Sequence, residues 1–172
     1  MKLRLLEEKD VEGMLDWMHD PKVNCFFRFN AENMTEERAV NFVKSAQESA
    51  EKKETFHFAI VDDADQYMGT ISLKEIDWDA KVAEYAISLR SVAQGKGYGS
   101  QATKEVLKYA FENLNLNRVF LNVLSDNESA IRMYKKCGFK YEGEFRNHIS
   151  VRGTIKSLKW FSILKDEFME EN

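Results

Sequence analysis

The sequence predicts a mixed α/β fold, called α+β by some labels, with helices packed on the faces of one sheet. A central stretch, residues 55–89, alternates apolar and polar residues with a period of two, which indicates an antiparallel meander of three strands. Before and after this stretch, helical and strand patterns alternate, as they do when helices cross over a sheet. The length of 172 residues suits one domain, so we expect residues 1–172 to fold as a single domain.

The N-terminal third predicts a strand followed by two helices. The strand is expected at residues 2–6, and the only proline, Pro21, is expected to close the first helix. The apolar face of that helix consists of residues three and four positions apart: Val11, Met14, Leu15 and Met18. Asn33 and Glu36 have the spacing of a capping box, which predicts a second helix that runs to about Lys52.

The meander and the C-terminal half complete the order β-α-α-β-β-β-α-β-α-β-β. Turn residues at 62–66 and 77–80 separate the three strands of the meander. A glycine-rich segment, residues 92–99, then leads into alternating helices and strands. These are expected at 100–113 (helix), 118–123 (strand), 128–136 (helix), 140–146 (strand) and 158–164 (strand).

Composition and charge argue against several classes of function. Lysine and arginine number 25 against 29 aspartate and glutamate, and the net charge of −4 gives no general attraction to nucleic acid. The longest apolar runs, such as residues 58–61, are far shorter than the roughly 18 residues that span a membrane, so we expect a cytoplasmic protein without membrane contact. Two distant cysteines, Cys25 and Cys137, and three scattered histidines predict neither a disulfide framework nor a metal site.

A cluster of glycines carries the strongest chemical signal. Gly95, Gly97 and Gly99 fall within five residues, between a predicted strand and a predicted helix. Glycine allows the backbone to approach an anion closely, and the first N–H groups of a helix attract phosphate. The same glycines could also serve a sharp turn alone. The spacing fits neither the dinucleotide fingerprint G-x-G-x-x-G nor the P-loop, so both of these nucleotide sites are excluded.

Two motifs together resemble a known family. Residues 94–99 fit the pattern Q/R-x-x-G-x-G/A. The second motif, N-x-x-A-x-x-x-Y-x-x-x-G-F, is matched by Asn127, Ala130, Tyr134, Gly138 and Phe139. On these residues the chain resembles the GNAT superfamily of acetyl-CoA-dependent N-acetyltransferases, in particular the branch with ribosomal-protein N-terminal, spermidine and amino-sugar acetyltransferases. The resemblance covers essentially the whole chain, and it implies a mixed, mostly antiparallel, splayed central sheet flanked by helices.

The resemblance also implies that acetyl-CoA is the co-substrate. The pantetheine arm is expected to pair with the backbone of Ile87, Ser88 and Leu89, and the pyrophosphate to lie on the glycine loop. The residues expected in that loop are Gln94, Gly95, Lys96, Gly97, Tyr98, Gly99 and Ser100. Asn127 is expected to contact CoA, although the sequence around it would equally make Asn127 a helix cap.

The implied mechanism is direct attack of an amine on the thioester in a ternary complex, so Cys137 need not be a nucleophile. The resemblance makes Tyr134 the group that protonates the departing thiolate, and a core tyrosine is the alternative. An alkylammonium must lose a proton before it attacks, and we expect Glu84 to accept it. Glu75 on the neighbouring strand and an ordered water are the alternatives for this base.

The expected acceptor is the primary amine of a small molecule: an amino sugar, a nucleotide-linked amino sugar or a polyamine. Residues 26–30 are aromatic where an acidic run is expected in spermidine acetyltransferases, and Arg28 and Arg146 favour an acceptor that carries negative charge. Alternatives are acetylation of a protein N-terminus, such as that of a ribosomal protein, and a non-catalytic acyl-CoA-binding module. A homodimer or higher homo-oligomer is compatible with the sequence.

Two further groups of residues could contact the acceptor. His148, expected between the last two strands, could titrate near neutral pH, but a lone surface histidine is the commoner case. Four aromatic residues could form a pocket wall or simply belong to the core, which we favour: Phe26, Phe27, Phe29 and Trp78.

Overall fold

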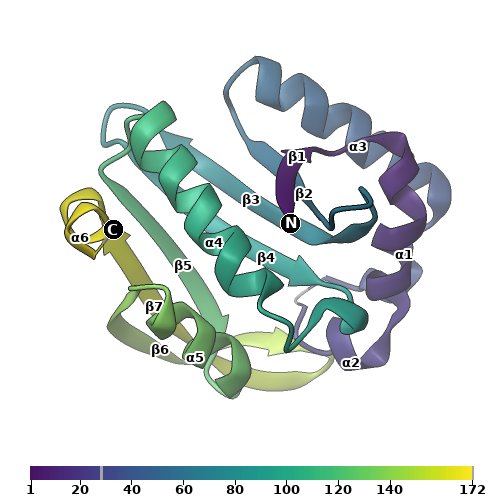
Figure 1. The fold of residues 1–172 in the computed structure, drawn as a ribbon. Helices are drawn as coiled ribbons and strands as arrows, with labels where there is room; N and C mark the ends of the chain where they lie inside the picture. Colours follow the sequence, from purple (N-terminus) through teal and green to yellow (C-terminus); the bar gives the residue numbers. More distant parts are fainter. Residues whose placement is uncertain (28, 172) are drawn as a thin grey trace.

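A seven-stranded sheet in the order β1-β2-β3-β4-β5-β7-β6 forms the centre of the fold (Figure 1). The computed structural model describes residues 1–27 and 29–171. All neighbouring strands are antiparallel except β4 and β5, which are parallel. The strands are β1 (Lys2–Leu5), β2 (Phe56–Val61), β3 (Tyr67–Asp77), β4 (Val82–Leu89), β5 (Arg118–Leu124), β6 (Lys140–Val151) and β7 (Thr154–Leu164). The mixed, mostly antiparallel sheet flanked by helices is thereby confirmed.

The helices fall into two groups that cover opposite faces of the sheet. They are α1 (Val11–His19), α2 (Pro21–Asn24), α3 (Glu36–Glu51), α4 (Tyr98–Lys108), α5 (Glu128–Lys136) and α6 (Lys165–Glu171). Phe58 and Ile60 of β2 belong to the apolar cluster that includes α4 and α5, whereas Ala59 and Val61 belong to the cluster with α1 and α3. This division follows from the period of two, because successive strand side chains point to opposite faces.

Local chemistry corrects several predicted boundaries near the N-terminus. The Oγ1 atom of Thr35 accepts a hydrogen bond from Arg38 N at 3.3 Å and caps α3, so the predicted Asn33 cap is wrong. Asn33 instead ends a short 3-10 turn, Ala31–Asn33. Pro21 begins α2 rather than only closing α1, since the first helical position needs no N–H donor.

The C-terminal strands are longer than the sequence predicts. Strand β6 extends to Val151 and β7 begins at Thr154, with a tight turn of Arg152 and Gly153 between them. Both turn residues have positive φ, 50° and 78°. The β6–β7 pairing is irregular between Tyr141 and Gly143 and between Phe145 and Ile149. These irregularities interrupt the alternation of apolar and polar residues, so the sequence pattern predicted strands that are too short. Helix α6 was not predicted. None of the described helices is long and apolar enough to cross a membrane.

The sheet splits between its two parallel strands. The β4–β5 ladder consists of Val82 with Arg118, Ala83 with Val119 and Glu84 with Phe120. Beyond these pairs the two strands diverge toward their C-terminal ends, and α4 lies across them on one face (Figure 1). The splayed sheet expected from the resemblance is therefore present, and the split lies beside the second half of β4.

Candidate active site

The second half of β4 presents one backbone edge to the split. Residues Ile87, Ser88 and Leu89 pair on their other edge with Ile71, Thr70 and Gly69 of β3. The ladder with β5 ends before them, at Glu84. An extended chain can add to such an edge through main-chain hydrogen bonds that place few demands on side chains. The three residues predicted to pair with pantetheine thus lie where an extended arm has access to β4.

The glycine loop follows directly after β4. Gly95 and Gly97 have φ values of 72° and 87°, in the left-handed region that favours glycine. Gly97 is the N-cap of α4, which begins at Tyr98 rather than at the predicted Ser100. An α-helix leaves its first N–H groups without partners inside the helix, and these groups attract anions. A Cβ added at Gly95 or Gly97 would meet nothing within 4 Å, so the space beside both residues is open.

Gly99 has a different role from the other two glycines. A Cβ at this position would lie 3.3 Å from Leu89 Cδ1, so Gly99 permits close packing of α4 on β4. The buried hydroxyl of Thr103 donates to Gly99 O at 2.6 Å and therefore accepts from the hydroxyl of Tyr85, 2.7 Å away. This chain of hydrogen bonds fixes the start of α4 against β4 and keeps the loop in register with the strand.

Tyr134 lies on α5, on the same face of the sheet as the glycine loop. Its side chain is 7% exposed and meets the rings of Tyr85 and Phe139 at 5.8 and 5.9 Å. Burial raises the pKa of Tyr134 well above the ordinary value for a phenol, so the hydroxyl remains protonated at neutral pH. Burial also raises the pKa of Cys137, which keeps this neighbouring thiol uncharged and unsuited to nucleophilic attack.

Glu84 lies at the apex of the split, where the ladder ends. Its Oε2 is 3.2 Å from Lys74 Nζ, and its Oε1 accepts a hydrogen bond from Asn122 Nδ2 at 3.1 Å. The Glu84 side chain is 14% exposed. Because side chains alternate along a strand, Glu84 projects to the face opposite that of Tyr85 and Tyr134. The predicted base and the predicted acid are therefore on opposite faces of the split sheet.

The comparisons with known proteins agree with this geometry. The family model described as an acetyltransferase (GNAT) domain matches residues 1–140. The chain belongs to the GNAT acetyltransferase family. It is an N-acetyltransferase, and acetyl-CoA is its co-substrate.

Relatives and solved structures match this acetyltransferase over part or nearly all of its length. Spermidine N(1)-acetyltransferase of Escherichia coli K12 is 27% identical over 172 residues, which are 100% of this chain and 90% of the relative. A Bacillus subtilis protein named "putative ribosomal N-acetyltransferase YdaF" is 34% identical over 60% of this chain and 56% of its own. The crystal structure of Vibrio cholerae spermidine N-acetyltransferase with CoA and spermine has a TM-score of 0.87, with 23% identity and coverage of 98% and 97%. At that identity the structural likeness concerns the fold.

Asn127 caps α5 of the acetyltransferase. Its Oδ1 accepts a hydrogen bond from Ala130 N at 3.2 Å, as expected of an N-cap asparagine. The helix-cap alternative is thus present in the structure. The side-chain Nδ2 is not used by this cap, and contact with CoA stays a prediction.

The remaining candidates are exposed side chains outside the buried core. Glu75 is exposed at an irregularity of the β3–β4 ladder and has a φ of 49°. Trp78 is 42% exposed at the β3–β4 turn, where its Nε1 donates to Lys53 O, so it belongs neither to the core nor to a wall with residues 26–29. His148 and Arg146 are exposed within β6, so the predicted place of His148 between the last two strands is wrong.

The aromatic segment after α2 is only partly core. Phe27 packs 5.0 Å from Trp17, ring to ring, and joins the cluster under α1. Phe26 and Phe29 are 42% and 48% exposed, so the preferred core assignment is wrong for them. Arg28 lies outside the described residues.

The sequence did not reveal the side chains that surround Glu84. Lys74 and Asn122 reach it from the two neighbouring strands, and Trp160 of β7 pairs with Asn122 in the ladder. The ring of Trp160 stacks on Phe120 at 6.0 Å, and its buried Nε1 has no hydrogen-bond partner in the described part of the chain. A signal did exist, because Asn122 interrupts an otherwise apolar strand at a position that faces away from the core. The sequence alone does not show that Asn122 lies beside Glu84, however, because this depends on the register of three paired strands.

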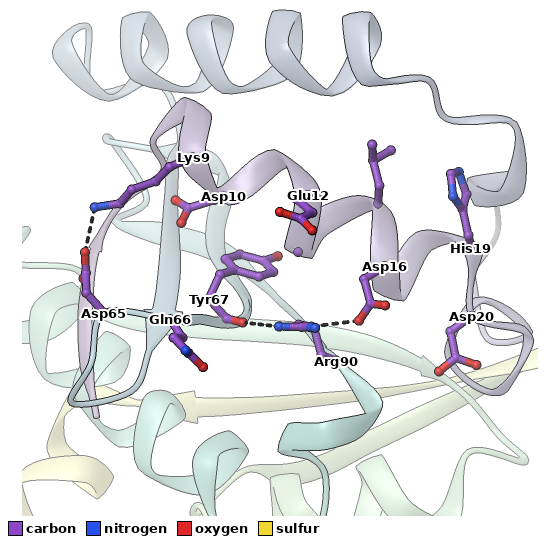
Figure 2. A pocket seen from close by; sticks show the side chains of 12 residues that line it. Lys9, Asp10, Glu12, Asp16, His19, Asp20, Asp65, Gln66, Tyr67 and Arg90 are labelled. Carbon is purple, nitrogen blue, oxygen red and sulfur yellow. Dashed lines mark hydrogen bonds and ion pairs between the residues drawn. The ribbon is translucent and has the colours of Figure 1, made fainter.

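A separate groove runs along α1 (Figure 2). It has a volume of about 800 Å³, and none of the predicted donor or catalytic residues lines it. Arg90 crosses the groove from the end of β4 and donates to Asp16 Oδ2 at 2.8 Å and to Tyr67 O at 3.1 Å. These bonds hold α1 against the C-terminal end of β4. Within the described residues, no group of three or more His, Cys, Asp and Glu side chains is arranged to hold a metal ion.

Proposed function

We propose that this acetyltransferase acetylates a primary amine of a polyamine in a ternary complex with acetyl-CoA. The observation that carries this proposal is the split at β4, with Glu84 at its apex on one face and buried Tyr134 on the other. Similarity to spermidine acetyltransferases along the whole chain supports a polyamine acceptor. A single domain formed by residues 1–172 carries the activity in this proposal.

The donor binds from the face covered by α4 and α5. The pyrophosphate lies on the loop from Gln94 to Ser100, whose open space and first-turn N–H groups suit an anion. The pantetheine arm follows the backbone edge of residues 87–89 that β5 leaves unpaired, and it competes there with Gln94 Nε2, which donates to Leu89 O at 3.3 Å. Asn127, at the start of α5, contacts CoA through its amide. A backbone N–H of β4 polarises the thioester carbonyl.

The acceptor approaches from the opposite face, and the bond changes follow in order. Glu84, directly or through a water, takes a proton from the ammonium, and the nitrogen lone pair attacks the carbonyl carbon. The C–S bond then breaks, and the thiolate takes the proton of the Tyr134 hydroxyl. The nitrogen, which became positively charged in the attack, releases its second proton through water to the tyrosinate, and this restores the hydroxyl. The raised pKa of Tyr134 keeps this proton in place until the thiolate forms. The products are an acetamide and CoA.

Other acceptors make different demands on the chain. A nucleotide-linked amino sugar would need cationic side chains to bind its phosphates. Arg146 is a cationic side chain that could do so, because it is exposed on β6. A protein N-terminus would need an open groove, and similarity to YdaF over 60% of the chain supports this second candidate. The cytoplasmic location and a homo-oligomeric state stay predictions.

An acceptor screen tests the proposed substrate class. With acetyl-CoA as donor and thiol release as readout, we expect the highest kcat/KM for spermidine or spermine. The comparison set is glucosamine, a nucleotide-linked amino sugar, an aminoglycoside and peptides with ribosomal-protein N-termini. A higher kcat/KM for a peptide or an amino sugar would contradict the proposal. Binding of acetyl-CoA without thiol release for any amine would instead favour the non-catalytic module.

The donor loop is tested by Gly97→Val. A β-branched residue is strained at a φ of 87°, so we expect affinity for CoA to fall at least about tenfold. Gly153→Val is a matched control, because Gly153 has a φ of 78° and equally open space but lies in the β6–β7 turn. Isothermal titration calorimetry measures both. Equal affinity of the Gly97 variant and the parent would show that the loop does not bind the donor.

The acid role is tested by Tyr134→Phe. We expect kcat to fall about 100-fold while the affinity for acetyl-CoA changes little, since the hydroxyl acts only as the thiolate leaves. Tyr109→Phe is a suitable control, because Tyr109 packs on Phe56 and Phe58 at the far end of α4. Unchanged turnover with a lower Tm for the Tyr134 variant would make Tyr134 a core residue only.

The base role is tested by the pH dependence of Glu84→Gln. An alkylamine has a pKa of about 10, so near neutral pH most of the acceptor is protonated and needs a base. We expect kcat/KM to fall about 10- to 100-fold near neutral pH, and the defect to shrink as pH rises toward the pKa of the amine. Glu75→Gln should follow the parent profile. A constant defect of the Glu84 variant at all pH values would exclude proton transfer to Glu84.

A further inference from the structure

The two halves of the split sheet need a second connection. One half consists of β1 to β4 and the other of β5, β7 and β6, and the ladder joins them only through residues 82–84 and 118–120. At the C-terminal end of β4 the strands have diverged. Three residue pairs at one end of an eight-residue strand leave the opposite end without backbone pairing between the two halves.

The described residues of the segment after α1, 20–27 and 29–33, contact both halves at this open end. On the β4 side, the hydroxyl of Ser91 donates to the Asp20 carboxylate. On the β6–β7 side, Nη2 of Arg152 donates to Asn24 Oδ1 at 2.8 Å and lies 3.7 Å from a carboxylate oxygen of Glu32. Helix α2, inside this segment, lies near the β6–β7 turn (Figure 1). The segment therefore bridges the opening.

The bond between Arg152 and Asn24 is the stronger part of the bridge. Asn24 is 1% exposed, and its Nδ2 donates to Met18 O at 2.9 Å. Its Oδ1 accepts from Arg152, which is 128 positions away in the sequence. A buried acceptor that loses its donor carries a desolvation cost, whereas the exposed pair of Arg152 and Glu32 contributes little. The tight turn fixes the backbone of Arg152 at a φ of 50°.

The bridge lies on the acceptor face. Ala59 packs under α1 and α3. It lies opposite Thr70 of β3, which lies opposite Ser88 of β4, so the three side chains point to the same face. Ser88 and Glu84 are separated by an even number of positions on β4, so both point to the face of α1. The segment that continues from α1 is thus on the side of Glu84, whereas α4 and α5 cover the donor side.

We propose that residues 20–27 and 29–33 form a strap across the open end of the split sheet, and that Arg152, by holding Asn24, is the positioning residue that sets the width of the acceptor site. This proposal depends on the proposed function in one respect, namely that the amine enters on the face of Glu84. Arg152 touches neither substrate. It acts through the strap, so its loss weakens acceptor binding and leaves the donor loop unchanged.

The experiment compares Arg152→Ala with the parent and with Arg38→Ala, a change of an exposed arginine on α3. We expect the KM for spermidine to rise about tenfold, because a buried amide oxygen loses its donor, while the KM for acetyl-CoA stays within about twofold. Arg152→Lys, which keeps one donor, should recover part of the loss. In an Asn24→Ala background, Arg152→Ala should have little further effect, since both changes break the same link.

Hydrogen exchange separates failure of the strap from failure of the proposed function. In the Arg152→Ala enzyme without acceptor, the amides of residues 20–33 should exchange at least about tenfold faster, and those of α4 should not. This readout holds even if spermidine is not acetylated. Unchanged exchange would overturn the strap. Faster exchange with an unchanged KM for spermidine, or with an equal rise of the KM for acetyl-CoA, would overturn the positioning role. Additive effects of the Asn24 and Arg152 changes would overturn the link between them.

Discussion

The short parallel ladder between β4 and β5 is the constraint on which the rest of the structure depends. Because the ladder ends at Glu84, the second half of β4 keeps a backbone edge that no strand of the described chain uses. A longer ladder would satisfy that edge and leave an extended arm without partners. The same shortness leaves the two halves of the sheet weakly joined, and contacts outside the ladder then have to fix the distance between them. The opening and the strap thus have one origin.

The alternation of side chains along β4 separates the two proton transfers of the proposed mechanism. Glu84 and Tyr85 are neighbours in sequence, yet one faces Lys74 and Asn122 and the other packs against Tyr134. The polar environment compensates the charge of a carboxylate, whereas the apolar environment raises the pKa of Tyr134 and preserves its proton. One strand therefore provides a site for a charged base and a site for a neutral acid without the two groups meeting. If β4 and β5 were paired along their whole length, the sheet would separate Glu84 from Tyr134. In the proposed mechanism, the split allows the amine and the thioester to meet between these two side chains.

Features that depend on local sequence could be predicted, and features that depend on register could not. The glycine loop and Tyr134 lie in short motifs. Gly95 and Gly97 have the positive φ values of a turn that favours glycine, whereas donor binding at this loop stays a prediction. Lys74 and Asn122 reach Glu84 only through the pairing of three strands, which no single segment specifies. The error at Asn33 has a local cause, since Thr35 competes for the cap and lies directly before the helix. The exposed Phe26 and Phe29 show that an aromatic run alone does not decide burial.

The division of labour between backbone and side chains explains how such a fold persists at low sequence identity. Donor recognition of the proposed kind uses main-chain N–H groups and a strand edge, which many sequences can supply, and it needs side-chain identity chiefly at glycines with positive φ. In the proposed mechanism, recognition of the acceptor falls to side chains on the opposite face and to the strap, where Asn24 and Arg152 must change together to keep their bond. Substitutions can therefore accumulate on the acceptor side without disturbing the donor side, because successive side chains of each strand point to opposite faces of the sheet. A TM-score of 0.87 at 23% identity is what this arrangement permits: the path of the backbone is retained while the surfaces that select the amine are free to differ.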